Sequence, residues 1–222
     1  MFIPLKDLNP RRGYPVVNTF IILTNLVVFF YELSLKLTLS PHAFQAFEIA
    51  NGTVPARIPA FLAGYVTFSA AFLPLLTSIF LHSGWLHILG NMLFLWIFGD
   101  NVEDFFGHIP YLFFYLLCGI GAGLVHILFN LSSHVPALGA SGAISGVMGA
   151  YTLLYPRARV LTLVFIFLVP IPAFLFLGYW ILLQFLSGIG AFGVAASGGV
   201  AWWAHVGGFL TGMLLTQIWR QR

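Results

Sequence analysis

The stretch from residue 105 to residue 156, FFGHIPYLFFYLLCGIGAGLVHILFNLSSHVPALGASGAISGVMGAYTLLYP, contains no Asp, Glu, Lys or Arg. A helix that crosses a membrane needs about 20 mostly apolar residues, so this stretch is long enough for more than one. The whole chain agrees, since 60% of its 222 residues are apolar and only 7% are charged, against about 25% charged in an average soluble domain. The sequence therefore predicts a multi-pass membrane protein.

Apolar runs and the residues that interrupt them predict six membrane-spanning helices. Their approximate limits are 16–34, 83–101, 110–131, 139–155, 171–187 and 201–219. In the apolar run 160–186, we take Pro170 and Pro172 as the start of the fifth helix, which leaves 160–169 as an interfacial segment. No internal repeat is visible. We therefore expect residues 1–222 to form a single all-α domain, a polytopic bundle of six transmembrane helices.

Two segments lie outside these spans. Residues 1–15 are expected to form a short cytoplasmic lead, and residues 35–73 form the one long connection. This connection contains three prolines and two weakly amphipathic stretches. Because long loops with apolar content are often functional or lie on a membrane surface, we expect a membrane-associated first loop.

The distribution of basic residues predicts the orientation in the membrane. Six spans place both termini and the second and fourth connections on one side, which holds Lys6, Arg11, Arg12, Arg157, Arg159, Arg220 and Arg222. The other side holds Lys36 and Arg57. Both termini are therefore expected in the cytoplasm, with a prokaryotic plasma membrane as the natural location. The basic residues are too few and too scattered to follow the phosphates of a nucleic acid, so the expected partner is the lipid bilayer.

Polar side chains at membrane depth are costly and usually functional, and the first cluster of them opens the fourth span with Gly139-Ala140-Ser141-Gly142. A serine at a helix start is commonly only a cap, and small residues in a membrane helix commonly serve close helix contact. Gly139 and Gly142, however, remove bulk on both sides of Ser141, so that a substrate backbone could approach. The N-terminus of a helix also favours a developing oxyanion. Ser141 is therefore a candidate nucleophile.

The second cluster is Ala204-His205-Val206-Gly207-Gly208 in the sixth span. A lone buried histidine is more often a structural hydrogen-bonding residue. Small residues recur, however, along one face of the sixth span and of the fourth, namely Ala204, Gly208 and Gly212, and Gly142, Gly146, Gly149 and Ala150. Contact between these faces would bring His205 to Ser141, where an imidazole is the usual base for a hydroxyl nucleophile. Because neither span contains Asp or Glu, we expect a Ser-His dyad.

The third cluster, at the start of the second span, contains His82, His87 and Asn91. His87 and Asn91 are four residues apart and share one helix face. A metal site is the alternative, but His82 is the only nearby third ligand and no carboxylate accompanies it. We therefore expect neither a metal nor another cofactor. Paired neutral donors suit an oxyanion hole, together with the backbone N–H of Ser141.

The three motifs, Gly-Ala-Ser-Gly (139–142), Ala-His-Val-Gly-Gly (204–208) and His-x4-His-x3-Asn (82–91), occur in the order and spacing of the rhomboid proteases, and the chain resembles that family over about 16–219. The resemblance implies a serine endopeptidase that cleaves peptide bonds in or beside transmembrane segments of membrane-protein substrates. Ser141 would then be the nucleophile, His205 the base, and His87 and Asn91 the oxyanion donors, in a site that opens to the non-cytoplasmic side. The resemblance also implies supporting roles for His82 and Glu103.

The sequence departs from the family pattern at three places, one of which is Gly90, beside Asn91, where a bulky residue can occur. Leu73-Pro74 stands where many members have Trp-Arg, and Ser145 stands where some members have a tyrosine that packs on the catalytic histidine.

Two other functions are alternatives to a protease. A transporter or channel would line a pathway with the same polar residues, but we find no inverted repeat and expect no intramembrane carboxylate. A non-catalytic rhomboid-like protein would lack the serine or the histidine, and both are present.

Overall fold

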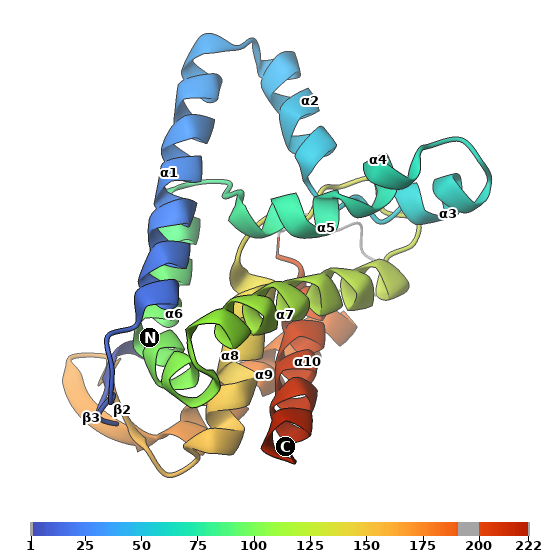
Figure 1. Cartoon of the computed structure of the whole chain (residues 1–222). Helices are drawn as coiled ribbons and strands as arrows, with labels where there is room; N and C mark the ends of the chain where they lie inside the picture. The colour runs from blue at the N-terminus through green and yellow to red at the C-terminus, as the bar shows by residue number, and fades with distance from the viewer. Residues whose placement is uncertain (1, 191–199, 222) are drawn as a thin grey trace.

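The computed structural model describes residues 2–190 and 200–221, most of which are helical. The elements in this part of the chain are β1 (Phe2–Asp7), α1 (Val16–Thr38), α2 (Pro41–Asn51), α3 (Arg57–Leu62), α4 (Phe68–Phe72), α5 (Pro74–Thr77), the 3-10 helix η1 (Ser78–Phe80), α6 (Trp85–Phe106), α7 (His108–Phe129), α8 (Ser141–Leu154), β2 (Arg159–Val164), β3 (Phe167–Pro172), α9 (Ala173–Gly190) and α10 (Trp202–Arg220). Figure 1 shows their arrangement, with both chain ends near the same end of the molecule.

A helix lies at each of the six predicted segments, namely α1, α6, α7, α8, α9 and α10. Of these, α1, α7 and α9 are long and apolar enough to cross a membrane, and the segment Phe68–Phe80 with α6 makes a bent pair that counts as a fourth. α8 is apolar but only 14 residues long. The apolar helical bundle agrees with the sequence prediction of a multi-pass membrane protein.

The connection 35–73 is largely helical. α1 extends to Thr38, four residues beyond the predicted end, and α2, α3 and α4 follow. With α5 they gather at the end of the molecule opposite the β-strands (Figure 1). Thr53 fixes this loop to the chain before α8, because its N–H donates to the carbonyl of Ala137 and its hydroxyl donates to the carbonyl of Pro74. The first loop therefore lies beside the start of α8.

A three-stranded antiparallel sheet corrects the all-α prediction. β1 pairs with β2 and β2 with β3, in the order β1-β2-β3. The predicted interfacial segment 160–169 is therefore part of a hairpin that recruits residues of the predicted cytoplasmic lead. An unbroken apolar run does not distinguish a strand from a buried helix. Pro170 and Pro172 fit this sheet because β3 is an edge strand, where a missing N–H costs little. α9 begins at Ala173, directly after Pro172 and two residues after the predicted start of the fifth span.

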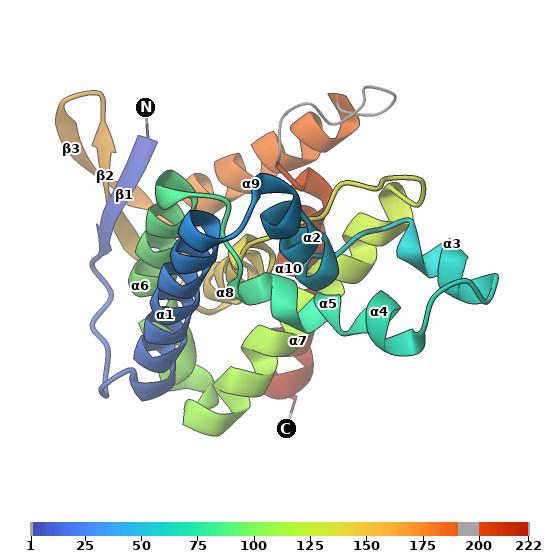
Figure 2. The same cartoon turned by 90° about the horizontal axis from the view of Figure 1, so that it is seen from above.

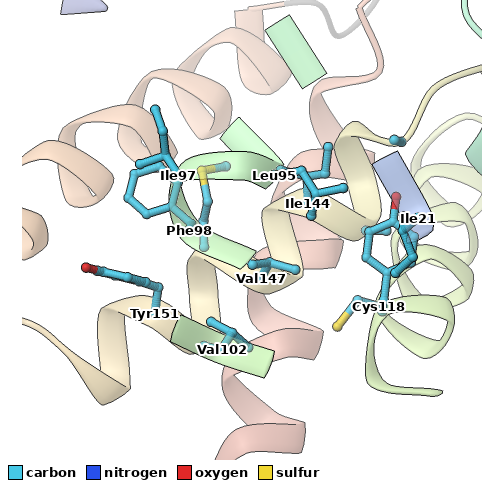
Figure 3. Close-up of a cluster of buried hydrophobic side chains, with 14 of the residues drawn as sticks. Ile21, Leu95, Ile97, Phe98, Val102, Cys118, Ile144, Val147 and Tyr151 are labelled. Atoms are coloured by element: carbon cyan, nitrogen blue, oxygen red, sulfur yellow. The ribbon is translucent and has the colours of Figure 1, made fainter. Parts of the chain in front are cut away.

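α8 lies in the interior of the bundle, with every residue from Gly142 to Tyr151 buried. Seen from above in Figure 2, α6, α7, α9 and α10 lie around it. Large buried side chains of α6 and α8 fill the space between these two helices, as Figure 3 shows for Leu95, Phe98, Val102, Ile144, Val147 and Tyr151. Because α8 has a single well-packed position, Ser141 at its start is held firmly.

Glycines bring α8 and α10 into backbone contact. A Cβ atom built on Gly208 would lie 1.9 Å from the carbonyl oxygen of Gly142, and one built on Gly212 would lie 2.0 Å from that of Gly146. A Cβ on Gly149 would lie 2.2 Å from the carbonyl oxygen of Phe209. Real Cβ atoms do not approach so closely, so only glycine permits this separation. The predicted contact between the two small-residue faces is confirmed.

Glu103, near the end of α6, fixes the start of α1. Its carboxylate accepts the backbone N–H of Val17 at 2.9 Å and that of Asn18 at 2.7 Å, and it also contacts His108. A carboxylate at a helix N-terminus satisfies unpaired N–H groups and interacts favourably with the helix dipole. Glu103 therefore holds α1 against α6, far from Ser141 along the bundle, and its position is consistent with a structural role.

Candidate active site

Ser141 and His205 meet at one end of the bundle. Ser141 is the first residue of α8, and His205 lies in the first turn of α10. The distance between Nε2 of His205 and Oγ of Ser141 is 2.8 Å, within hydrogen-bond range. The His205 side chain is buried and Ser141 is half-buried. A hydroxyl group and an imidazole in this geometry can exchange a proton.

Small residues allow two helices, α7 and α10, to come close to the start of α8. A Cβ on Gly142 would lie 2.6 Å from the Cβ of Ala122 on α7, while Gly208 of α10 touches the Gly142 carbonyl as described above. Gly142 therefore contributes by letting α7 come close, and Gly208 by letting α10 come close. The contact of Gly208 with the Gly142 carbonyl sets the distance between α8 and α10, the two helices that carry Ser141 and His205.

His87 and Asn91 converge on the backbone just before Ser141. Both project from the start of α6. A Cβ built on Gly139 would lie 2.6 Å from Nε2 of His87 and 3.7 Å from Nδ2 of Asn91, so the two nitrogens face the same spot. Gly139 has φ +124°, a conformation that favours glycine. A side chain here would displace His87, which explains why the sequence has glycine at this position.

The two candidate donors differ in their surroundings. Nδ1 of His87 lies 3.1 Å from Oγ of Ser83. Nδ2 of Asn91 is buried and has no hydrogen-bond partner among the residues that the structure describes. An unsatisfied buried donor costs about 1–3 kcal/mol, so a group of this kind is a candidate for ligand binding.

His82 connects this cluster to α1. Its backbone N–H donates to the carboxylate of Glu32, at 3.0 Å from Oε2, and its ring lies 5.1 Å from the ring of His87. His82 therefore lies next to His87 and links it to α1. Glu32 corrects the expectation of no intramembrane carboxylate, since it is a buried acid within the predicted first span. An ionisable residue in an apolar helix is the sequence signal that would have identified it.

Gln184 is a second residue that the sequence analysis missed. It lies on α9 and its side chain is buried. Oε1 of Gln184 lies 2.7 Å from Nδ1 of His205, and Nε2 of Gln184 donates to the carbonyl of Trp180 at 3.3 Å. The Trp180 ring lies 5.6 Å from the His205 ring. The signal was again a polar side chain inside an apolar helix, here within the predicted fifth span.

A small cavity adjoins the reactive hydroxyl. It has a volume of about 30 Å³ and its lining includes Ser141, Gly139, Gly142, Ala204 and His126. A space of this size can hold a water molecule when polar groups line it. Within residues 2–190 and 200–221, no three His, Cys, Asp or Glu side chains lie close enough together to hold a metal ion.

Comparisons with known proteins extend this picture. A family model described as the Rhomboid domain matches residues 69–222. Rhomboid protein 1, mitochondrial, of Saccharomyces cerevisiae is 34% identical over 144 residues, which cover 62% of this chain and 39% of the yeast protein. RHOMBOID-like protein 1 of Arabidopsis thaliana is 35% identical over 64% of this chain and 33% of its own length. Rhomboid protease GluP of Bacillus subtilis is 43% identical over 34% of this chain and 14% of its own length. The alignments thus span less than half of each relative.

Proposed function

Since this chain belongs to the rhomboid family, we propose that it is an intramembrane serine endopeptidase that cleaves peptide bonds in or beside transmembrane segments of other membrane proteins. The observation that carries the proposal is the 2.8 Å contact between Oγ of Ser141 and Nε2 of His205. The name of the Bacillus subtilis relative, a rhomboid protease, agrees with it. The chemistry is acyl transfer by a Ser-His pair.

In the first half of the reaction, His205 removes the hydroxyl proton of Ser141 while Oγ attacks the substrate carbonyl carbon. The carbonyl oxygen becomes an oxyanion. His205 then gives its proton to the leaving amine as the peptide bond breaks, which leaves an acyl-enzyme on Ser141. A helical substrate hides its carbonyl groups in backbone hydrogen bonds, so the substrate must unwind locally before the attack.

The oxyanion would be stabilised by the backbone N–H of Ser141 and by the side-chain donors of His87 and Asn91. Two observations support this part of the proposal. The two side-chain nitrogens face the same spot beside Gly139, and Nδ2 of Asn91 has no partner among the described residues. A donor that is already buried and oriented needs no reorganisation when the negative charge develops.

In the second half, a water molecule attacks the acyl-enzyme with His205 as the base, and Ser141 is released. The 30 Å³ cavity beside Ser141 is large enough for that water. Its lining includes the polar side chains of Thr53, Ser78 and His126 beside several glycine and alanine residues. We expect small side chains and helix-breaking residues near the cleaved bond, because the substrate helix must unwind there to expose its carbonyl group.

The membrane arrangement is part of the same proposal. We place α1, α6, α7, α8, α9 and α10 as six spans in one domain, with both termini in the cytoplasm. α8 with its 14 residues is about 21 Å long, shorter than the roughly 30 Å hydrocarbon core. Ser141 would therefore lie below the non-cytoplasmic surface.

The cellular location is also part of the proposal. One relative is mitochondrial and another is bacterial; a prokaryotic plasma membrane is the proposed location here. Arg222, one of the basic residues that predict a cytoplasmic C-terminus, lies outside the described residues.

The proposal is tested with purified protein in detergent, a fluorophosphonate probe, and a single-span peptide that carries a fluorophore and a quencher across an Ala-Ser bond. We expect the probe to label Ser141 and the peptide to be cleaved. Ser141→Ala should lose both signals, whereas Ser145→Ala, one helical turn further along, should keep the labelling. Cleavage that persists in Ser141→Ala would refute the proposal, and inhibition of the wild-type protein by a chelator would point to metal chemistry instead.

A further inference from the structure

We propose that Gln184 is the positioning residue that fixes the tautomer and the orientation of His205. The inference rests on the proposed function, because it concerns the base of that reaction. In the better-known hydrolytic triads an aspartate performs this task. Here the sequence contains no Asp or Glu after Asp104, so no side-chain carboxylate lies on α8, α9 or α10. The amide of Gln184 takes that place.

The orientation of the amide determines which atom faces His205. Nε2 of Gln184 donates to the carbonyl of Trp180, one turn earlier on the same helix. This bond directs the amide nitrogen along α9 and leaves Oε1 facing Nδ1 of His205 at 2.7 Å. An amide oxygen accepts hydrogen bonds and cannot donate them. The proton between these two atoms therefore belongs to Nδ1 of His205.

This tautomer is the one that a base needs. A neutral imidazole carries one proton, so a proton on Nδ1 leaves a lone pair on Nε2. Nε2 is the atom that lies 2.8 Å from Oγ of Ser141. The opposite tautomer would place an N–H against the hydroxyl and could not accept its proton. Gln184 thus selects the reactive form of His205 before any substrate arrives.

Burial explains why an amide suits this position. Gln184 is 7% exposed and His205 is 9% exposed. A carboxylate at this depth would have to leave water, at a cost of several kcal/mol, whereas a neutral amide provides direction at a smaller cost. When His205 becomes an imidazolium, its bond to Oε1 becomes charge-assisted and stronger. Gln184 thereby stabilises the charged form of the base without carrying charge itself.

The positioning group comes from a third helix. Ser145 stands on α8 one turn after Ser141, and its hydroxyl donates to the carbonyl of Ser141 at 2.6 Å. Nothing in that contact holds His205. Trp180, on α9 with Gln184, lies beside the imidazole at 5.6 Å between ring centres. The base is therefore competent only while α9 is seated against α10, which makes the position of α9 a condition for activity.

The test compares Gln184→Met, which keeps the size but removes the acceptor, with Gln184→Glu, which restores an acceptor oxygen. Leu183→Met, at a half-exposed neighbouring position on α9, is the matched control. With the quenched peptide, we expect Gln184→Met to lower kcat about 10- to 100-fold and to change KM less than threefold. The loss in kcat is smaller than the roughly 10²- to 10⁴-fold that a general base usually contributes, because His205 itself remains. Gln184→Glu should keep kcat within about threefold of wild type, because an acceptor oxygen remains, but it should lower the thermal unfolding midpoint, because a carboxylate buried at this depth must leave water. Leu183→Met should leave both constants unchanged.

A second measurement does not depend on the stability of any variant. Nitrogen-15 NMR of wild-type protein with labelled histidine should show His205 protonated at Nδ1 and bare at Nε2 near neutral pH. The opposite tautomer, or a Gln184→Met enzyme with wild-type kcat, would overturn the inference. These results are separable from a failure of the proposed function, which would appear as wild-type protein that neither cleaves the peptide nor reacts with the fluorophosphonate.

Discussion

Gly212→Ala should damage activity from a site two helical turns away from His205. Gly212 lies on α10, where an added Cβ would lie 2.0 Å from the carbonyl oxygen of Gly146 and 2.6 Å from its Cα. These are backbone atoms of α8, which cannot turn aside as a flexible side chain could. The two helices must therefore separate at this level.

The required movement can be compared with the hydrogen bond that it breaks. Ordinary contact begins at about 3.4 Å, so α10 must recede by about 1.4 Å from the 2.0 Å position. If α10 moves as a rigid rod, the 2.8 Å contact between His205 and Ser141 lengthens to about 4 Å, beyond hydrogen-bond range. A misplacement of about 1 Å can cost about 10²-fold in rate, and overpacking costs about 1–3 kcal/mol of stability. We therefore expect kcat to fall by about 10²-fold.

The assay is cleavage of the quenched peptide, followed together with the thermal unfolding midpoint of the protein in the same detergent. Gly178→Ala is the matched control, because a Cβ at that position on α9 meets nothing within 4 Å. Gly178→Ala should retain wild-type activity with an equal or higher midpoint, since alanine is the better helix former. Wild-type activity and an unchanged midpoint in Gly212→Ala would refute the view that backbone contact between α8 and α10 sets the distance between serine and histidine.

Three further predictions concern other contacts. Gly139→Ala should reduce kcat for the quenched peptide at least 10-fold, because its Cβ would lie 2.6 Å from Nε2 of His87 and displace that side chain. A kcat equal to that of the wild-type protein would contradict the role of His87 as an oxyanion donor. Glu103→Ala should lower the free energy of unfolding by about 1–3 kcal/mol, because it leaves two N–H groups at the start of α1 unpaired. Thermal unfolding measures this loss, and fluorophosphonate labelling of Ser141 below the unfolding midpoint should stay at the wild-type level. Burial raises the pKa of Asp7 to about 6, so the folded protein binds more protons than the unfolded chain between about pH 4 and 6, and stability should fall as the pH rises through this window. Asp7→Asn, which keeps an acceptor for Tyr151, should flatten that slope, and an unchanged slope would show that another group is responsible.

The helices of this protein could be predicted from sequence because membrane helices are defined by local composition. An unbroken apolar run of sufficient length has few alternatives when its backbone must satisfy its own hydrogen bonds. The sheet could not be predicted in this way. Its first strand, Phe2–Asp7, precedes the first span and its other two strands follow α8, so the pairing depends on where α8 ends relative to the start of the chain. The apolar run 160–169 carries no period that distinguishes a strand from a helix.

Sequence alone was sufficient to bring Ser141 and His205 forward as partners. The glycine and alanine positions on the two spans specify which faces meet, and backbone contact between such faces leaves little freedom in the distance between helices. The four-residue spacing of His87 and Asn91 likewise identified them as neighbours on one face of the second span. These inferences needed only spacing along the chain, because the spacing of a helix is fixed.

Only the tertiary structure decided what lies behind His205. The sequence contains no Asp or Glu after Asp104, so it predicted a Ser-His dyad in which the orienting role of a third carboxylate is absent or met by packing. The structure places Gln184 of α9 at 2.7 Å from Nδ1 of His205, a contact that depends on the rotation and tilt of α9 against α10. Neither quantity is encoded by composition or by local spacing, since both result from how side chains of several helices fill the same space.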